Sequence, residues 1–338
     1  MTAYIILIIS LCVFCLPKNN RLFFFLSFAL LFFIGAFRDV SVGTDSANYS
    51  TLLEQYGENV SEVHRVGEPL FLLIHFVSAI SGWGYEGMQL LCMTIMLSFL
   101  SIFIYKVSSH HQYSLLCYVL LYFYFYSFNT TRQYLAIPFV LLSYYYLSSG
   151  NIIKYFLCLL CATLFHFSAI ITIVVYFLKK YRISENIQIS LLISTFLLGL
   201  TPLVSSLVGN MLSSTIYEAH VDSSSYGSRE TLFSLSRLLL TFYTIWLVYL
   251  LKNKDLYIQI LVVGVCFLNI FAFQAVLGRF AQYFTIVQIV VIPNLTFLVK
   301  NGKFLNVLKV SSFIYMFATW LYLISSNVAG VVPWKMFY

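Results

Sequence analysis

Long apolar runs follow one another along the chain, separated by short polar stretches. A spanning helix needs roughly 20 apolar residues, whereas a strand of a membrane barrel alternates apolar and polar positions. The runs here are continuous and therefore predict helices. We expect an all-α, polytopic integral membrane protein with about 11–12 membrane segments. The expected segments are residues 3–16, 22–37, 68–80, 87–105, 113–128, 133–148, 152–178, 187–208, 235–251, 256–277, 280–298 and 307–326.

Two polar stretches are longer than simple connections, residues 38–67 and 209–234. The first is rich in acidic side chains and the second is rich in serine. Both are poor in lysine, as expected of loops on the outer side of a membrane. We predict that both are extracytoplasmic loops. Because no soluble segment interrupts the apolar runs, residues 1–338 are predicted to form a single transmembrane domain.

The order of inside and outside loops depends on how two segments cross the membrane. If residues 68–80 and 152–178 each cross once, Arg132 faces the cytoplasm. If 68–80 is re-entrant and 152–178 bends near His166 into a helix pair, Arg132 and His166 face outside. Both schemes keep the lysine clusters in the cytoplasm, as the positive-inside rule requires. The second is preferred because it also moves two further lysines to the cytoplasmic side.

The composition agrees with a membrane protein. Of 338 residues, 61% are apolar and 9% are charged, and the mean hydropathy is +0.89. The net charge of +7 follows from cations in cytoplasmic loops, and no basic stripe suggests nucleic acid as a partner. The seven cysteines lie in apolar stretches, so they are interpreted as packing residues and not as metal ligands.

Arginine and lysine are distributed differently in the preferred topology. Ten of the eleven lysines fall on the cytoplasmic side, whereas six of the eight arginines fall outside or near the outer boundary. The planar guanidinium suits phosphate and carboxylate groups better than a lysine ammonium does. The pattern suggests an anionic ligand such as a diphosphate, although chance and ion pairing with loop acids would also explain it. The six arginines are Arg38, Arg65, Arg132, Arg229, Arg237 and Arg279.

Polar residues gather in four places where the chain is otherwise apolar. The first is the stretch from Arg38 to Tyr49, in which Asp45 and Tyr49 share a face if that piece is helical. The second is Glu68, which stands between a glycine and a proline before an apolar run. Glu68 is therefore either a helix-capping carboxylate or a functional one.

The other two groups lie farther along the chain. The third is Asn129-Thr-Thr-Arg132-Gln133, which closes one aromatic helix and opens the next, and His166 stands deep within apolar sequence. Arg279 is followed three and four residues later by Gln282 and Tyr283, on the same face of a continuous helix. Ionisable residues in membrane segments are costly and usually functional. The alternatives are snorkelling arginines and a buried neutral histidine bonded to a neighbouring helix.

Familiar catalytic signatures of other kinds are absent from the sequence. There is no GxSxG elbow, no HExxH pair, no phosphate-binding P-loop and no GxGxxG turn. We therefore expect no metal site and no nucleotide cofactor.

At its polar groups the chain resembles the EpsG-like, Wzy-type polymerases of bacterial exopolysaccharide, capsule and O-antigen. The resemblance rests on the segment from Arg38 to Tyr49, Glu68 before an apolar helix, Arg132-Gln133, and Phe-His166-Phe-Ser. It implies a glycosyltransferase of GT-C architecture in the bacterial cytoplasmic membrane, with its active site facing outside. Such an enzyme would move a growing glycan from undecaprenyl diphosphate onto a new lipid-linked repeat unit, without a cofactor. The expected partners are this lipid-linked oligosaccharide, membrane lipid and a protein that regulates chain length.

On this reading, roles follow from the chemistry of the groups. Arginines stabilise a diphosphate leaving group, and a carboxylate or imidazole accepts the proton of the acceptor hydroxyl. The candidate bases, in order of preference, are Glu68, Asp45 and His166. The diphosphate ligands would be Arg38, Arg132 and Arg279, and the residues that orient sugar hydroxyls would be Tyr49, Gln133 and Tyr283.

Three other functions remain open from the sequence. An O-antigen ligase would use the same donor with a different acceptor. A flippase or transporter of lipid-linked oligosaccharide would place charges along a central path and often shows internal repeats. A membrane scaffold would need none of the polar groups.

Overall fold

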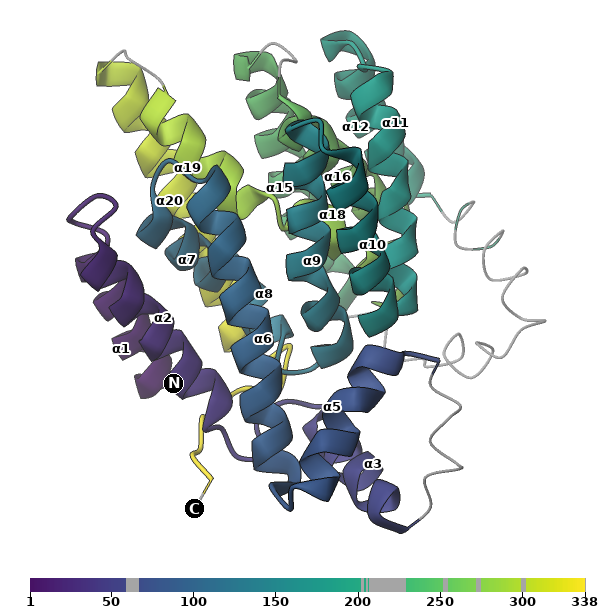
Figure 1. The fold of residues 1–338 in the computed structure, drawn as a ribbon. Coiled ribbons are helices and arrows are strands. Elements are labelled where there is room, and N and C mark those ends of the chain that lie inside the picture. Colours follow the sequence, from purple (N-terminus) through teal and green to yellow (C-terminus); the bar gives the residue numbers. More distant parts are fainter. Residues whose placement is uncertain are drawn as a thin grey trace. The chain divides into compact units, whose positions relative to one another are not determined.

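The structure is a computed structural model that describes residues 1–58, 67–201, 204, 206, 229–251, 255–271, 275–298 and 302–337. Within these ranges the regular secondary structure is helical, which confirms the all-α prediction (Figure 1). The chain forms two compact units. The first comprises residues 1–170 and 289–338, and the second comprises residues 171–288.

The first unit begins with the helices α1 and α2. Two further helices follow, α3, which contains Tyr49, and α5, which begins after Glu68. Helix α3 lies within the stretch 38–67, whose location outside the membrane stays a prediction. Its residues Tyr49 and Leu53 are four apart, and their buried side chains give the helix one apolar face. The helices up to this point are α1 (Thr2–Phe14), α2 (Arg21–Ala36), α3 (Ser46–Glu58), α5 (Pro69–Ile80) and α6 (Gly84–Val107).

Two of the later helices in this unit are interrupted. Tyr122 adopts a left-handed backbone conformation (φ 69°) and separates α7 (His111–Leu120) from α8 (Phe123–Tyr126). After α9 (Thr131–Ser148), helix α10 (Ile152–Phe165) ends just before His166. The backbone of His166 is extended, and a 3-10 helix, η2 (Phe167–Ile173), follows. The predicted bend near His166 is therefore confirmed.

The C-terminal part of the first unit returns to its N-terminal helices. After α19 (Gln288–Leu298) and α20 (Gly302–Ser325), the last residues run beside the end of α2 (Figure 1). The amide of Asp39 donates to the carbonyl oxygen of Lys335 at 2.9 Å, and the Tyr4 hydroxyl donates to the carbonyl oxygen of Val331 at 2.8 Å. The C-terminal segment 326–337 thereby fixes the connection between α2 and α3.

The second unit is built around α16 (Leu256–Phe271), which packs against α12, α15 and α18. Glycine permits the closest approaches, because a Cβ atom at Gly199 would lie 1.9 Å from the carbonyl oxygen of Asn269. The buried Arg237 donates to the same carbonyl oxygen at 3.3 Å. The other helices are α11 (Val174–Lys180), α12 (Glu185–Gly199), α15 (Arg229–Leu251), α17 (Ala275–Phe280) and α18 (Gln282–Thr285).

The predicted segments and the helices differ mainly at their ends. Residues 229–234 were expected in the loop 209–234 but already belong to α15, since the first turn of a helix tolerates polar residues. The preceding part of that loop lies outside the described residues. Of the described helices, Gly84–Val107 and Asn306–Ser325 are long and apolar enough to cross a membrane, and several shorter apolar helices accompany them.

Candidate active site

Glu68 is the centre of a polar cluster in the first unit. It stands at the N-terminal end of α5, where Gly67 takes a left-handed conformation (φ 60°) and Pro69 starts the helix. The carboxylate does not cap the helix. It turns instead to Arg132, whose Nη1 donates to Oε2 at 3.0 Å, and to His166, whose Nδ1 hydrogen-bonds to Oε1. The capping alternative for Glu68 is therefore wrong, and its functional role stays a prediction.

Arg132 is the more exposed partner of the ion pair with Glu68. It lies in the first turn of α9, and its side chain is 38% exposed, whereas that of Glu68 is 5% exposed. The guanidinium carbon stands 6.0 Å from the ring centre of the buried Phe71, three residues after Glu68 on α5. Arg132 also interacts with Tyr49, yet its side chain is exposed enough for an anion to reach the guanidinium.

His166 reaches the cluster because α10 ends at Phe165. The extended backbone of His166 turns its ring toward Glu68, and the side chain remains 25% exposed. An ionised carboxylate can only accept hydrogen bonds, so Nδ1 donates to it and Nε2 is the nitrogen left to take up a proton. This is the arrangement of a general base oriented by a buried acid.

Tyr49 and Asp45 extend the cluster along α3. Tyr49 is buried, and its ring meets Phe71 edge-on with 5.6 Å between ring centres. Burial raises the pKa of Tyr49 above its usual value, although the charge of Arg132 and a hydrogen bond with it act in the opposite direction. The charge of Asp45 raises the pKa of Tyr49 further, so Asp45 lies close enough to Tyr49 to interact with it electrostatically. Asp45 itself is partly exposed.

The electrostatics of the cluster decide the state of Glu68. Burial alone raises the pKa of the carboxyl, but the contacts with His166 and Arg132 outweigh burial. The pKa of Glu68 is therefore lowered below its usual value of 4.5. Glu68 is ionised near neutral pH, and both of its oxygen atoms are engaged. These contacts suit an orienting residue better than a free base.

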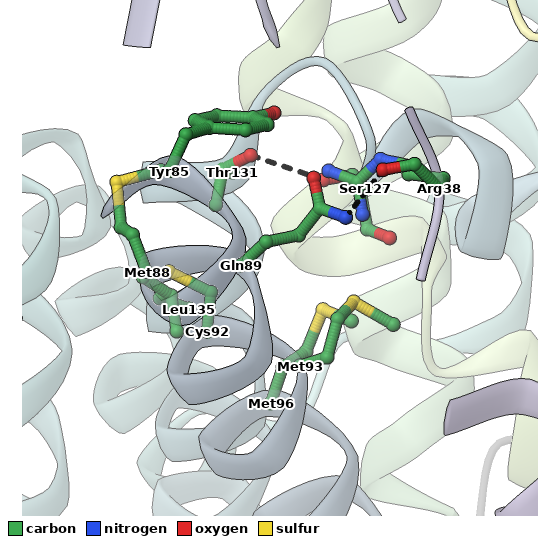
Figure 2. A pocket seen from close by; sticks show the side chains of 10 residues that line it. All are labelled: Arg38, Tyr85, Met88, Gln89, Cys92, Met93, Met96, Ser127, Thr131 and Leu135. Atoms are coloured by element: carbon green, nitrogen blue, oxygen red, sulfur yellow. Dashed lines mark hydrogen bonds between the residues drawn. The ribbon is translucent and has the colours of Figure 1, made fainter. Parts of the chain in front are cut away.

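Arg38 occupies a separate pocket of the same unit (Figure 2). Its side chain is buried, donates to the carbonyl oxygen of Gly35 and stacks over Phe128, with 4.4 Å from guanidinium carbon to ring centre. Gln89 points toward Arg38 and donates to its carbonyl oxygen at 2.9 Å (Figure 2). No acidic side chain of the described ranges forms an ion pair with Arg38. The cavity of about 10 Å³ has room for about one water molecule.

Three further predicted residues lie in other parts of the structure. Gln133 is buried in α9. Arg279 is exposed at the end of α17, whereas Tyr283 is fully buried in α18. Ala281 stands as a turn between the two short helices but keeps helical backbone angles (φ −58°, ψ −27°). Arg279 and Tyr283 both belong to the second unit, and their roles in the same site stay predictions.

The structure also gives contacts that the sequence did not predict. Asn129, from the polar stretch 129–133, and the C-terminal segment 326–337 hold the turn before α3. Phe71 lies between Tyr49 and Arg132. The position of Phe71, one helical turn after Glu68, was a signal that could have identified it. Within the described ranges, no three His, Cys, Asp or Glu side chains come together as metal ligands would.

The state of Glu68 makes stability depend on pH. Its pKa is lower in the folded than in the unfolded chain, so the carboxylate stabilises the fold above pH 4.5. This contribution disappears as the pH falls through the lowered pKa. Near neutral pH we expect Glu68→Gln to be less stable than the wild type by about 1–2 kcal/mol. In thermal unfolding of the detergent-solubilised protein, this difference should vanish in acid.

The control for this experiment is Glu86→Gln, because Glu86 is exposed in the first turn of α6. That substitution should leave the unfolding temperature nearly unchanged at every pH. A Glu68→Gln difference that is the same at neutral and acid pH would contradict the assigned charge of Glu68.

The comparisons with known proteins identify the family. The model of the EpsG family matches residues 21–336, which is nearly the whole chain and includes both units. No curated protein and no solved structure matches. The matched range contains every residue of the Glu68 cluster. The chain therefore belongs to the EpsG family.

Proposed function

We propose that this membrane protein is a polysaccharide polymerase that extends a glycan carried on undecaprenyl diphosphate. Membership of the EpsG family indicates a polymerase-type role in exopolysaccharide synthesis. The observation that carries the more specific proposal is the contact of one buried carboxylate, Glu68, with both Arg132 and His166. A base and an anion-binding group thereby lie next to each other.

The proposed reaction assigns each group one task. Nε2 of His166 takes the proton from a hydroxyl of the acceptor repeat unit, and the resulting oxygen nucleophile attacks the anomeric carbon of the donor glycan. The bond from that carbon to the diphosphate oxygen breaks, and its electron pair stays on the lipid diphosphate. Arg132 stabilises this negative charge. Glu68 offsets the positive charge that develops on His166.

This proposal changes the order of candidate bases. The sequence favoured Glu68 because burial raises the pKa of a carboxyl group. In the structure, the contacts with His166 and Arg132 outweigh burial and lower the pKa of Glu68. The His166 side chain is partly exposed and has an orienting partner, so we propose His166 as the base and Glu68 as the residue that positions it.

The other predicted residues support the substrate in this scheme. Tyr49 and Gln133 would orient sugar hydroxyls together with Asp45. Arg38 is too deeply buried to touch a lipid diphosphate directly, but it shares a pocket with Thr131, which precedes Arg132. Its charge would therefore add to the positive potential near Arg132. Arg279 and Tyr283 belong to the second unit, and diphosphate binding by Arg279 and sugar binding by Tyr283 stay predictions.

The contacts also support one of the two topologies. If residues 68–80 crossed the membrane completely, Glu68 and Arg132 would lie on opposite sides, which a 3.0 Å contact does not allow. Helix α5 has 12 residues and is about 18 Å long, whereas the apolar layer is about 30 Å thick. We therefore propose that α5 is re-entrant. The cluster would face the outer side of the bacterial cytoplasmic membrane, in a multi-pass protein of GT-C architecture.

Arg132→Lys tests the diphosphate-binding role. Lysine keeps the charge but loses the planar fork that can hold Glu68 and a phosphate oxygen together. We expect the variant to insert normally and its rate of polymer formation to fall about 100-fold or more. Active sites lose rate on this scale when one donor that stabilises the transition state is removed. The measurement is polymer formed per amount of membrane-inserted protein. The matched control is Arg21→Lys at the exposed start of α2, which should remain fully active.

An Arg132→Lys variant that makes polymer at the rate of Arg21→Lys would contradict this role.

The function itself is tested by the lipid-linked glycans of the native bacterium after deletion of the gene. A polymerase predicts loss of polymer and accumulation of single repeat units on the lipid carrier. Full-length polymer left on the carrier would indicate a ligase instead. Repeat units trapped on the cytoplasmic face would indicate a flippase, and an unchanged profile would rule out a role in glycan synthesis.

A further inference from the structure

A side-chain amide helps to hold the turn that leads into α3. Asn129, in the connection between α8 and α9, is buried and bonds in two directions. Its Oδ1 accepts from the backbone amide of Thr44 at 2.8 Å, and its Nδ2 donates to the carbonyl oxygen of Ala329 at 2.8 Å. One side chain therefore joins the turn before α3 to the C-terminal segment.

Two glycines allow the turn before α3 and the C-terminal segment to approach each other closely. The amide of Gly43 donates to the carbonyl oxygen of Gly330 at 3.0 Å, and both glycines have positive φ angles, +107° and +61°. A Cβ atom at Gly43 would lie 2.9 Å from Oδ1 of Asn129, and one at Gly330 would lie 2.9 Å from Cγ2 of Thr44. Larger residues would push the two segments apart and separate Asn129 from its partners.

The turn held in this way carries polar groups of the candidate site. Thr44 is exposed and Asp45 is partly exposed. The carbonyl oxygen of Asp45 accepts from the amide of Tyr49 in the first turn of α3. Tyr49 in turn interacts with Arg132, which follows Asn129 by three residues. Asn129 thus fixes the turn from the same short stretch of chain that supplies Arg132.

We propose that Asn129 is a positioning residue that sets the Thr44–Asp45 turn as the binding site for hydroxyl groups of the acceptor sugar. This inference rests on the proposed polymerase function. The Asp45 carboxylate accepts hydrogen bonds from sugar hydroxyls, and the Thr44 hydroxyl can both donate and accept. The side-chain amide of Asn129 offers an acceptor and a donor on two separate atoms, so it can reach both backbone partners at once. The C-terminal segment is part of the site because it receives the second bond.

The chain offers a closely matched control. Asn294 in α19 also bridges an amide and a carbonyl: its Oδ1 accepts from Ser109 at 2.6 Å and its Nδ2 donates to Val107 at 3.1 Å. These partners lie at the C-terminal end of α6, whereas Gln89 near Arg38 lies at its start. Asn294→Ala removes an equivalent pair of hydrogen bonds away from the candidate site.

The first measurement is hydrogen–deuterium exchange of the full chain in detergent. In Asn129→Ala the amide of Thr44 loses its acceptor, so peptides that contain Gly43 and Thr44 should exchange about tenfold faster or more, the effect of losing about one hydrogen bond. Asn294→Ala should leave these peptides unchanged. Equal exchange at Thr44 in Asn129→Ala and the wild type would overturn the inference, whatever the activity.

The second measurement is polymerisation in liposomes at saturating donor, with lipid-linked repeat units purified from the deletion strain as the varied acceptor. We expect Asn129→Ala to raise the acceptor KM about tenfold and to change kcat little. Asn129→Asp keeps the acceptor for Thr44 and should show a smaller rise in KM. Asn294→Ala should leave KM unchanged. An Asn129→Ala variant with faster exchange but an unchanged KM would overturn the assignment of the turn to the acceptor.

The two proposals fail in different ways. A wild-type protein that makes no polymer overturns the proposed function and with it the sugar-binding role of the turn, whereas the exchange result still decides whether Asn129 fixes the turn. A variant whose only defect is a lower yield of folded protein, with normal KM per folded molecule, would show that Asn129 is merely structural.

Discussion

A carboxylate shielded from water needs positive charge and hydrogen-bond donors around it, and at Glu68 these come from two other helices. This requirement determines the geometry of the candidate site. It brings the first turn of α9 and the end of α10 to the start of α5, and it directs Arg132 and His166 toward the same carboxylate. Removing either partner would leave charge in a poorly hydrated place, so the three residues depend on one another for their positions.

The irregular parts of the fold serve the same arrangement. Helix α10 ends at Phe165, and the extended backbone of His166 brings its ring to Glu68. The connection from α2 to α3 contains no regular helix, and its amides bond instead to the C-terminal segment and to Asn129. A membrane protein tolerates irregular backbone where its polar groups have such partners. The breaks between helices are therefore the places where this chain can gather polar side chains.

The sequence revealed much of this site and for a clear reason. Ionisable residues are so rare in the chain that Glu68, Arg132 and His166 stood out against apolar neighbours, and the bend at His166 followed from the topology. The bonds of Asn129 could not be predicted, because its partner Ala329 is 200 positions away and no local pattern encodes that pairing. The burial of Arg38 and the choice between Glu68 and His166 as base depend on contacts among distant segments. The sequence left open whether the piece around Tyr49 is helical, because only the buried face of α3 is apolar.

The central claim is that Glu68 acts through His166, and a double-mutant cycle tests it most directly. The polymerisation rate in liposomes would be measured for the wild type, Glu68→Gln, His166→Gln and the double variant. The account predicts a loss of about 100-fold or more for His166→Gln. If the two residues acted independently, the fold losses of the single variants would multiply in the double variant. The account predicts that the double variant is at least about tenfold more active than that. Losses that multiply would mean that Glu68 and His166 act independently, which would contradict the account.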